Sequence, residues 1–387
     1  MKYFSLPADF KSHTIDRYRE LNHRYDDAKV VETYGQVTDG TVLNSGRVID
    51  VIPAVDFKQL EKYVKYSTES DITFNYTLNP ACFGNFEFSE MGHRQIKALL
   101  ERLYNIGISS LTVSSPSLVE LVQASGWKFH IKASALCEIT SPGKALFYKK
   151  LGMERIVVDP DVTRDFRTLR NICRVFGSGV EIIINNVCYK NCAYKMFHYN
   201  HESHSTPLNT TQTVTDYFFN RCSMQKAGSL ENVIRLNWIR PEDLKYYHEV
   251  GIFYLKIQGR QNVLQGDVVK ALTHYMDGDY QGNLFDLITI FAPYNAFQPY
   301  IDNKKLDGFV RKFFENPDFC RNVCEPCNYC QGYALKSMDQ ESTEQINKKA
   351  LAFYRDYDEY TKMIRQEENP KVKKLFSKDE LEEEFNF

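Results

Sequence analysis

The order of hydrophobic and polar positions along the chain predicts short strands that alternate with helices. Runs rich in β-branched and aromatic residues predict strands at 29–36, 72–78, 110–114, 128–133, 155–159, 181–186, 233–238 and 253–258. Longer stretches with apolar residues every three or four positions predict helices between them, for example at 91–104, 117–124, 166–175 and 263–275. Eight strands that alternate with helices over about 250 residues predict a (β/α)8 barrel of the TIM type.

An open doubly wound sheet is the alternative architecture for the same alternation. Such a sheet commonly carries Gly-x-Gly-x-x-Gly after its first strand, and no such motif follows the strand predicted at 29–36. The pattern changes after about residue 280, where loop-forming residues precede a long charged helical region. We therefore expect a barrel over 1–280, a loop-rich cysteine segment over 281–337 and a charged helical tail over 338–387.

Composition and charge exclude several classes of protein. Of the 387 residues, 43% are hydrophobic and 25% are charged, which is typical of globular proteins. The strongly apolar runs, such as 180–184, are far shorter than the roughly 20 residues that a membrane span requires. The N-terminus has no apolar signal core, and the net charge of −2 gives no overall basic field for nucleic acid. We expect a cytoplasmic protein with no membrane span.

Ten cysteines without a secretory signal indicate metal or thiol chemistry rather than disulfides. Cys188 and Cys192 directly follow the strand predicted at 181–186, and barrels build their active sites at such strand ends. Soft thiolates select zinc, copper(I) or iron–sulfur clusters. We expect this pair to bind a metal centre, with Cys222 as a third ligand; a pair of ordinary loop cysteines is the alternative.

A second group of thiols follows near the end of the chain, at Cys320, Cys324, Cys327 and Cys330. Structural zinc usually takes two separated pairs of ligands, whereas four thiols within eleven residues favour an iron–sulfur cluster. Zinc remains the alternative metal. Some of these thiols could instead reach the site at the barrel mouth.

Histidine and cationic residues extend the candidate site. His198 and His201 follow the Cys188/Cys192 pair and are candidate catalytic bases, with hydrogen-bonding residues of a wet cleft as the alternative. Arg240, Lys256 and Arg260 follow the last two predicted strands, where barrels often bind a phosphate group. We expect these three side chains to bind an anionic substrate; neutralisation of buried carboxylates is the alternative.

Several of these motifs together resemble one known family. They are Asn-x-x-Cys188-x-x-x-Cys192, Phe-His198-x-x-His201, Trp-Ile-Arg240-Pro241-Glu, Lys256-x-x-Gly259-Arg260 and the terminal cysteine run. The chain resembles the collagenase-like peptidase family (peptidase family thirty-two) over about residues 25–335. The resemblance implies a barrel. It also implies, as in several members, a 4Fe–4S cluster held by four cysteines and oxygen-independent hydroxylation of ubiquinone precursors or RNA, with prephenate implicated.

The sequence departs from the better-known members of that family in its cysteine spacing. The Cys188/Cys192 pair is tighter than theirs, and the run at 320–330 is not general among them. The resemblance therefore supports cluster binding by Cys188 and Cys192 but no particular substrate.

Three functions from different classes remain open. The first is an iron–sulfur enzyme that modifies an anionic or aromatic small molecule, or an RNA. The second is a peptidase with Cys188 or Cys192 as nucleophile and His198 or His201 as base. The third is a non-catalytic metal or electron-transfer protein that serves a redox or paralogous partner. The metal content of protein purified without oxygen distinguishes the second function from the other two.

Overall fold

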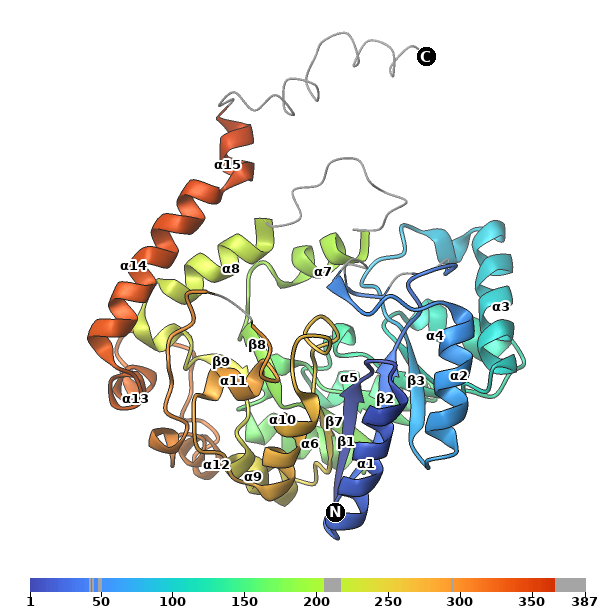
Figure 1. Ribbon diagram of the computed structural model, residues 1–387, viewed down its shortest axis with the longest axis horizontal. Coiled ribbons are helices and arrows are strands. Elements are labelled where there is room, and N and C mark those ends of the chain that lie inside the picture. The colour runs from blue at the N-terminus through green and yellow to red at the C-terminus, as the bar shows by residue number, and fades with distance from the viewer. Residues whose placement is uncertain (42, 44, 48–50, 205–216, 294–295, 366–387) are drawn as a thin grey trace.

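The computed structural model describes residues 1–41, 43, 45–47, 51–204, 217–293 and 296–365, and its centre is a closed barrel of parallel strands (Figure 1). The strands are hydrogen-bonded in the order β1-β10-β7-β6-β5-β4-β3-β2, and β1 pairs with β2 to close the ring. Their bounds are β1 Lys2–Pro7, β2 Ala28–Gly35, β3 Thr73–Leu78, β4 Ser110–Val113, β5 His130–Ala133, β6 Arg155–Val157, β7 Val180–Ile183 and β10 Tyr254–Lys256. The predicted barrel fold is thus confirmed.

The membership of the barrel differs from the sequence prediction at two strands. Strand β1 was not predicted, because six residues ending in a proline give a weak local pattern that pairing on both sides makes into a strand. The strand predicted at 233–238 is wrong as a barrel member. Its last residues form β9 (Leu236–Trp238), which pairs antiparallel with β8 (Asn185–Tyr189) outside the barrel, and β10 pairs directly with β7.

The helices cover the outside of the barrel with their apolar faces. In α6, for example, Phe166, Leu169, Ile172 and Phe176 are buried, at the spacing that places residues on one side of a helix. The helices that connect successive barrel strands are α1 Ser12–Arg24, α2 Phe57–Thr68, α3 Glu90–Asn105, α4 Pro116–Ala124, α5 Pro142–Lys150 and α6 Phe166–Phe176. Helix α10 (Val268–Asp277) follows β10 and contacts α1.

A long insertion between β7 and β10 carries the elements that lie above the barrel mouth and one helix, α9 (Leu244–Glu249), at the opposite end (Figure 1). It contains α7 (Lys195–His204) and α8 (Tyr217–Ala227) in addition to α9, β8 and β9. The chain leaves the barrel at Asn185, whose side-chain Nδ2 donates to the carbonyl of Gln258 at 2.8 Å and whose Oδ1 accepts from the Gln258 amide at 2.7 Å. In Figure 1, α7 and α8 lie at the top, at the end of the barrel toward which β1 points.

The C-terminal part of the chain packs against this insertion. It forms α11 Leu284–Ile288, α12 Arg311–Glu315, α13 Tyr329–Ser337, α14 Gln340–Tyr357 and α15 Glu359–Ile364. Helix α14 contacts α8 through Ala350 and Tyr354, which lie in a small cluster with Ala227, and Arg221 of α8 bonds Asp358 at 2.6 Å. The helical region predicted beyond 338 is confirmed as far as residue 364, and the remainder lies outside the described residues. Within the described residues, no helix has the length and apolar character needed to cross a membrane.

The interior of the barrel is polar and charged, although barrel interiors are usually filled by branched apolar side chains. The ammonium of Lys132 on β5 lies 2.5 Å from Glu32 of β2 and 2.7 Å from Glu181 of β7, which places all three inside the ring. Arg155 of β6 lies 3.7 Å from Glu32 and 3.5 Å from Glu181. We call these four residues the interior ion network. In this network two cations balance two carboxylates, as buried charges require.

Replacing Lys132 by methionine tests the interior ion network. Lys132→Met leaves two buried carboxylates with only Arg155 as partner, so we expect the free energy of unfolding at pH 7 to fall by about 3–5 kcal/mol. Lys132 contributes to lowering the pKa of Glu181 to about 2 against the opposing effect of burial. A carboxyl pKa lowered by folding stabilises the protein above the unfolded pKa and ceases to do so as the pH falls. The difference between Lys132→Met and the wild type should therefore shrink below about pH 4.

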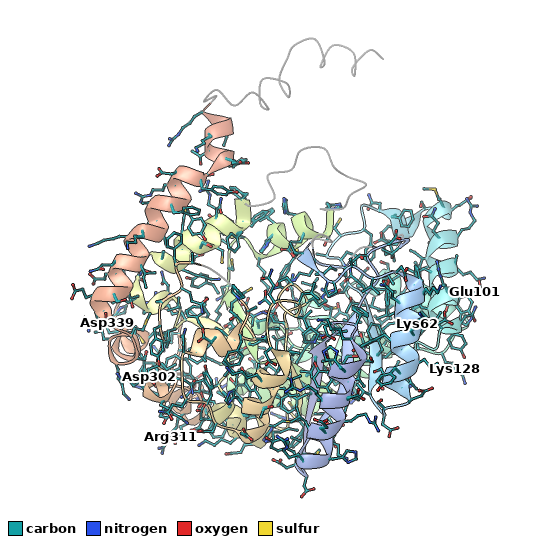
Figure 2. The ribbon with its side chains drawn as sticks, in the orientation of Figure 1. Lys62, Glu101, Lys128, Asp302, Arg311 and Asp339 are labelled. Atoms are coloured by element: carbon teal, nitrogen blue, oxygen red, sulfur yellow. The ribbon has the colours of Figure 1, made fainter. Side chains whose placement is uncertain are left out.

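The measurement is urea unfolding of the wild type and Lys132→Met, once at pH 7 and once below about pH 4. Lys128 lies on the surface beside the N-terminal end of β5 and is the matched control (Figure 2). Its replacement, Lys128→Met, should leave the unfolding midpoint unchanged. Equal stability of Lys132→Met and the wild type at pH 7 would contradict the structural role of the network.

Candidate functional site at the barrel mouth

A cavity opens at the C-terminal ends of the barrel strands. It has a volume of about 640 Å³, which includes space open to solvent. Residues at the ends of six barrel strands, β2, β3, β5, β6, β7 and β10, and one residue of α7 meet there, because the carboxyl ends of the strands in a parallel barrel converge on one face. The polar residues that line it include Tyr34, Asn79, Ser134, Lys256, Gln258 and Arg260. The cavity therefore occupies the position at which barrel enzymes bind their substrates.

Arg260 places a guanidinium group in the cavity wall. Its Nη1 donates to Gln36 Oε1 at 2.6 Å, to Ser45 Oγ at 2.6 Å and to Thr77 Oγ1 at 3.0 Å. All three acceptors are uncharged, so no described carboxylate neutralises this side chain in an ion pair. Burial, with a contribution from nearby Arg47, lowers the pKa of Arg260 to about 10. A buried cation with neutral partners favours an anionic ligand.

Lys256 lies in the same cavity and has no carboxylate partner within bonding distance among the described residues. Its Nζ lies over the ring of Tyr34, 3.8 Å from the ring centroid. The ring is held in place because the Tyr34 hydroxyl donates to the carbonyl of Ile257 at 2.8 Å. Burial first, and then repulsion from Lys132, lower the pKa of Lys256 to about 8. The structure thus brings Lys256 and Arg260 together, as the sequence predicts.

Arg240 does not line this cavity, so the prediction that it lies at the barrel mouth is wrong. Its Nε donates to Asp243 at 2.8 Å, and its Nη1 bonds Asp307 at 2.9 Å and the carbonyl of Asn303 at 2.7 Å. The prediction assumed that 233–238 was a barrel strand, whereas Arg240 follows a strand that pairs outside the barrel. The alternative weighed for it, neutralisation of a buried carboxylate, describes its environment.

Three cysteines converge beside the mouth. Cys188 lies on β8, Cys192 lies in the turn before α7, and Cys222 lies on α8. Burial raises the pKa of Cys188 to about 11, and the next largest contribution comes from Cys222; Cys192 contributes as well. The pKa of Cys192 is also raised, by burial and by Cys222. We call Cys188, Cys192 and Cys222 the mouth thiols. In the part of the chain that the structure describes, they are not arranged as a ready-made metal site.

The four remaining clustered cysteines form a second, separate group, which we call the outer thiols. Cys320, Cys324 and Cys327 are exposed, and Cys330 at the start of α13 is half-buried. Burial raises the pKa of Cys330, Arg164 opposes that shift, and Cys320 and Cys324 add to it. Cys320 lines a surface cleft with Arg164, Arg167 and Arg321. The group therefore interacts with itself and with this basic cleft, outside the mouth cavity.

The candidate bases His198 and His201 lie on α7, above the cavity. His198 Nε2 lies 3.1 Å from Glu202, and its ring stacks on Phe218 with 5.3 Å between the centroids. Glu202 also accepts a bond of 3.0 Å from Arg47. Burial opposes ionisation of Glu202, but Arg47 and His198 outweigh it and lower its pKa to about 2. The ring of His201 meets Phe218 edge-on at 5.4 Å, and burial lowers the pKa of His201.

Sequence analysis missed several residues that line the cavity. Asn79 and Ser134 come directly after β3 and β5, so their position just past a strand was a usable signal. Ser134 Oγ accepts from Asn79 Nδ2 at 3.0 Å and from the amide of Leu136 at 3.2 Å. Both bonds use the oxygen as acceptor, so the hydroxyl proton can be donated to a ligand. Arg47 lies in an irregular loop, and no sequence signal pointed to it.

The fold and the cavity define a (β/α)8-barrel protein with a cationic mouth and thiols beside it. The family model described as peptidase family U32 matches residues 52–286. The chain is 29% identical to an uncharacterized protease, MJ1657, of Methanocaldococcus jannaschii over 340 residues, which are 86% of this chain and 98% of that protein. The chain therefore belongs to peptidase family U32, the family that its motifs resemble.

The similarity to solved structures is lower. The structure of the U32 peptidase Mk0906 is 16% identical with a TM-score of 0.47, and the match covers 67% of this chain and 94% of that one. A D-psicose 3-epimerase is 10% identical with a TM-score of 0.31, and the match covers 55% of this chain and 82% of the epimerase.

Replacing Arg240 tests whether this residue stabilises the fold or binds an anionic ligand. Arg240→Ala leaves the buried carboxylate of Asp243 without its partner, so we expect the free energy of unfolding to fall by about 3–5 kcal/mol. Arg311 is exposed and pairs with exposed Glu315, so Arg311→Ala should change stability little (Figure 2). Urea unfolding measures both variants. An Arg240→Ala protein of wild-type stability that binds anions more weakly would restore Arg240 to the binding site.

Proposed function

We propose that this protein is an iron–sulfur enzyme that modifies a small anionic substrate bound in the mouth cavity. The single observation that carries the proposal is the convergence of the three mouth thiols, from separate elements, beside a cavity whose wall holds Arg260 and Lys256. Membership of family U32 supports the same reaction class, oxygen-independent hydroxylation, through the members that the motifs resemble. A thiolate-bound cluster supplies one-electron chemistry at such a site.

The chemistry of the donor set, rather than its present arrangement, suits a metal centre with an open position. Cys188, Cys192 and Cys222 supply three soft ligands, and a fully ligated 4Fe–4S cluster takes four thiolates. All ten cysteines of the chain lie among the described residues, and the outer thiols interact with one another rather than with the mouth thiols. Three protein ligands would leave one coordination position for substrate or water, which is the arrangement that catalytic metal sites use. Zinc is the alternative metal for the same ligands.

The outer thiols supply a complete set of four ligands for a second centre. Because Cys320, Cys324 and Cys327 are exposed, a metal centre there would exchange electrons with a redox partner at the surface. The cleft beside Cys320 holds four cationic and two acidic side chains, with Arg167 paired to Asp318, and this excess of positive charge would favour an acidic partner. This arrangement supports a supply of electrons to the mouth from outside the barrel.

A peptidase with a cysteine nucleophile is the second candidate, and the name of family U32 favours it. The environment of the thiols opposes it. A nucleophilic cysteine needs a lowered pKa, whereas burial raises the pKa of Cys188 to about 11. Among the described residues, His198, the candidate base, is hydrogen-bonded to Glu202 and to neither Cys188 nor Cys192, so no thiol–base pair is formed. Metal-free protein that hydrolyses peptides and loses this activity in Cys188→Ser would establish the peptidase in place of the iron–sulfur enzyme.

Iron content tests the role of the mouth thiols. Protein purified without oxygen should contain iron and acid-labile sulfide, and Cys188→Ser, Cys192→Ser and Cys222→Ser should each lose iron because a ligand is removed. Cys173→Ser is the matched control, since Cys173 is a half-buried thiol on α6, away from both groups. It should keep the wild-type iron content.

Two results would contradict the proposal. Stoichiometric zinc with no iron would replace the iron–sulfur centre by a zinc site. Full iron in all three mouth variants, with loss of iron only in Cys324→Ser and Cys327→Ser, would assign every metal to the outer thiols and remove the mouth site.

Anion binding tests the role of Arg260. Hydrogen bonds to a charged group contribute about 1.5–3 kcal/mol, so Arg260→Ala should weaken the binding of an anion by roughly tenfold to a hundredfold. Calorimetric titration with an aromatic carboxylic acid and with a nucleoside monophosphate measures the effect, and the iron content of the variant should stay unchanged. If the wild type binds neither compound, or if Arg260→Ala is folded and binds both as tightly as the wild type, Arg260 is not a substrate-binding residue.

A further inference from the structure

Lys256 differs from the other charged residues in the barrel because its charge is not balanced. Lys132 and Arg155 already engage both carboxylates of the interior ion network. Lys256 Nζ makes no hydrogen bond or ion pair with any described residue and lies over the ring of Tyr34, 3.8 Å from the ring centroid. Since Lys256 is 8% exposed and lines the mouth cavity, its amine is shielded from bulk water but open to a ligand.

The charged groups around Lys256 come from every side of the barrel. Glu32 on β2 and Glu181 on β7 favour its protonated form, and Lys132 on β5 and Arg260 oppose it. Burial is the largest influence, and the result is a pKa of about 8. A substantial share of Lys256 is therefore neutral near pH 8, and a neutral lysine amine in a desolvated site is a nucleophile toward carbonyl groups.

We propose that Lys256 forms an imine with a small oxo acid, a molecule that carries both a carboxylate and a ketone or aldehyde. This inference rests on the anion-binding cavity of the proposed function and names the substrate class and a covalent step. Arg260 binds the carboxylate, which places the neighbouring carbonyl carbon within the cavity that Lys256 lines.

The step balances without an oxidant or reductant. The Nζ lone pair attacks the carbonyl carbon, a C–N bond forms, and the carbonyl oxygen takes a proton to give a carbinolamine. Ser134 lines the cavity, and its hydroxyl proton can be donated to that oxygen because both of its own bonds use the oxygen as acceptor. The attacking nitrogen loses one N–H proton, which restores the Ser134 hydroxyl. The hydroxyl group of the carbinolamine then takes a proton from solvent and leaves as water, and a protonated C=N bond to Nζ, the iminium form, remains. The positive charge of the iminium form is balanced by the substrate carboxylate.

Reductive trapping of the wild-type protein tests this proposal directly. The protein as isolated is incubated without oxygen with pyruvate and sodium cyanoborohydride, and peptide mass spectrometry locates the secondary amines that form. We expect modification of Lys256 to exceed that of ordinary surface lysines by about tenfold or more at pH 7.5, since a lower pKa leaves more amine neutral. Lys62 and Lys128 are exposed and serve as the reference lysines (Figure 2).

Buried Lys132, which two carboxylates hold as a cation, should stay unmodified and is the matched interior control. Acetone, which carries the same ketone without a carboxylate, should label Lys256 much less than pyruvate does. Modification that is no higher at Lys256 than at Lys62 and Lys128 would overturn the proposal, and equal labelling by acetone would overturn the assignment of an oxo acid.

A variant that keeps the charge separates covalent reaction from simple ion pairing. Lys256→Arg should bind pyruvate within a few-fold of the wild type by calorimetry but yield no adduct in the peptide that contains residue 256. An adduct of equal yield in that peptide would overturn the proposal. If this variant does not fold, the peptide map of the labelled wild type still shows whether Lys256 forms the adduct. Iron content is measured on the same samples, so an iron-containing protein without a Lys256 adduct refutes only this inference and leaves the proposed function standing.

Discussion

The pairing of Lys132 with Glu32 and Glu181 is the interaction on which the rest of the structure depends. It joins β5 to β2 and β7 across the inside of the barrel, and Arg155 completes the balance of charge. An ion removed from water is tolerated only with a partner, so these four residues must be present together. Because they neutralise one another, Lys256 and Arg260 remain as excess positive charge at the mouth. The excess positive charge of the cavity thus follows from how the barrel interior is filled.

The thiols reach the mouth because the chain leaves the barrel early. At Asn185 the backbone stops pairing with β10, and the Asn185 side chain instead makes two hydrogen bonds to the backbone of Gln258. Asn185 begins β8, which carries Cys188. Cys222 comes from α8, which is held by α14 and by the ion pair between Arg221 and Asp358. The C-terminal helices therefore support the site although they lie outside the barrel. Loss of these helices would release α8 and with it one of the mouth thiols.

Sequence reasoning placed residues at the barrel mouth correctly where its assumptions about strands held. Lys256 and Arg260 follow a true barrel strand and both line the cavity, as predicted. Arg240 follows an antiparallel strand outside the barrel, so the rule that strand ends form the active site did not apply to it. Charged residues within predicted strands, among them Glu32, Lys132 and Glu181, were a visible signal for a polar interior. That signal identifies no partners, because pairing across a barrel joins residues a hundred positions apart.

The sequence by itself determined the class of fold, the family motifs and the two groups of thiols, since hydrophobic periodicity and cysteine spacing are local properties of the chain. Only the tertiary structure decided which strands close the barrel, which cations are already paired and which thiols lie near one another. Strand β1 is part of the barrel because it pairs with β2 and β10. Arg240 has a structural role because it forms ion pairs with Asp243 and Asp307. Charge balance and strand pairing depend on residues distant in the chain, and no local pattern records which of them will meet.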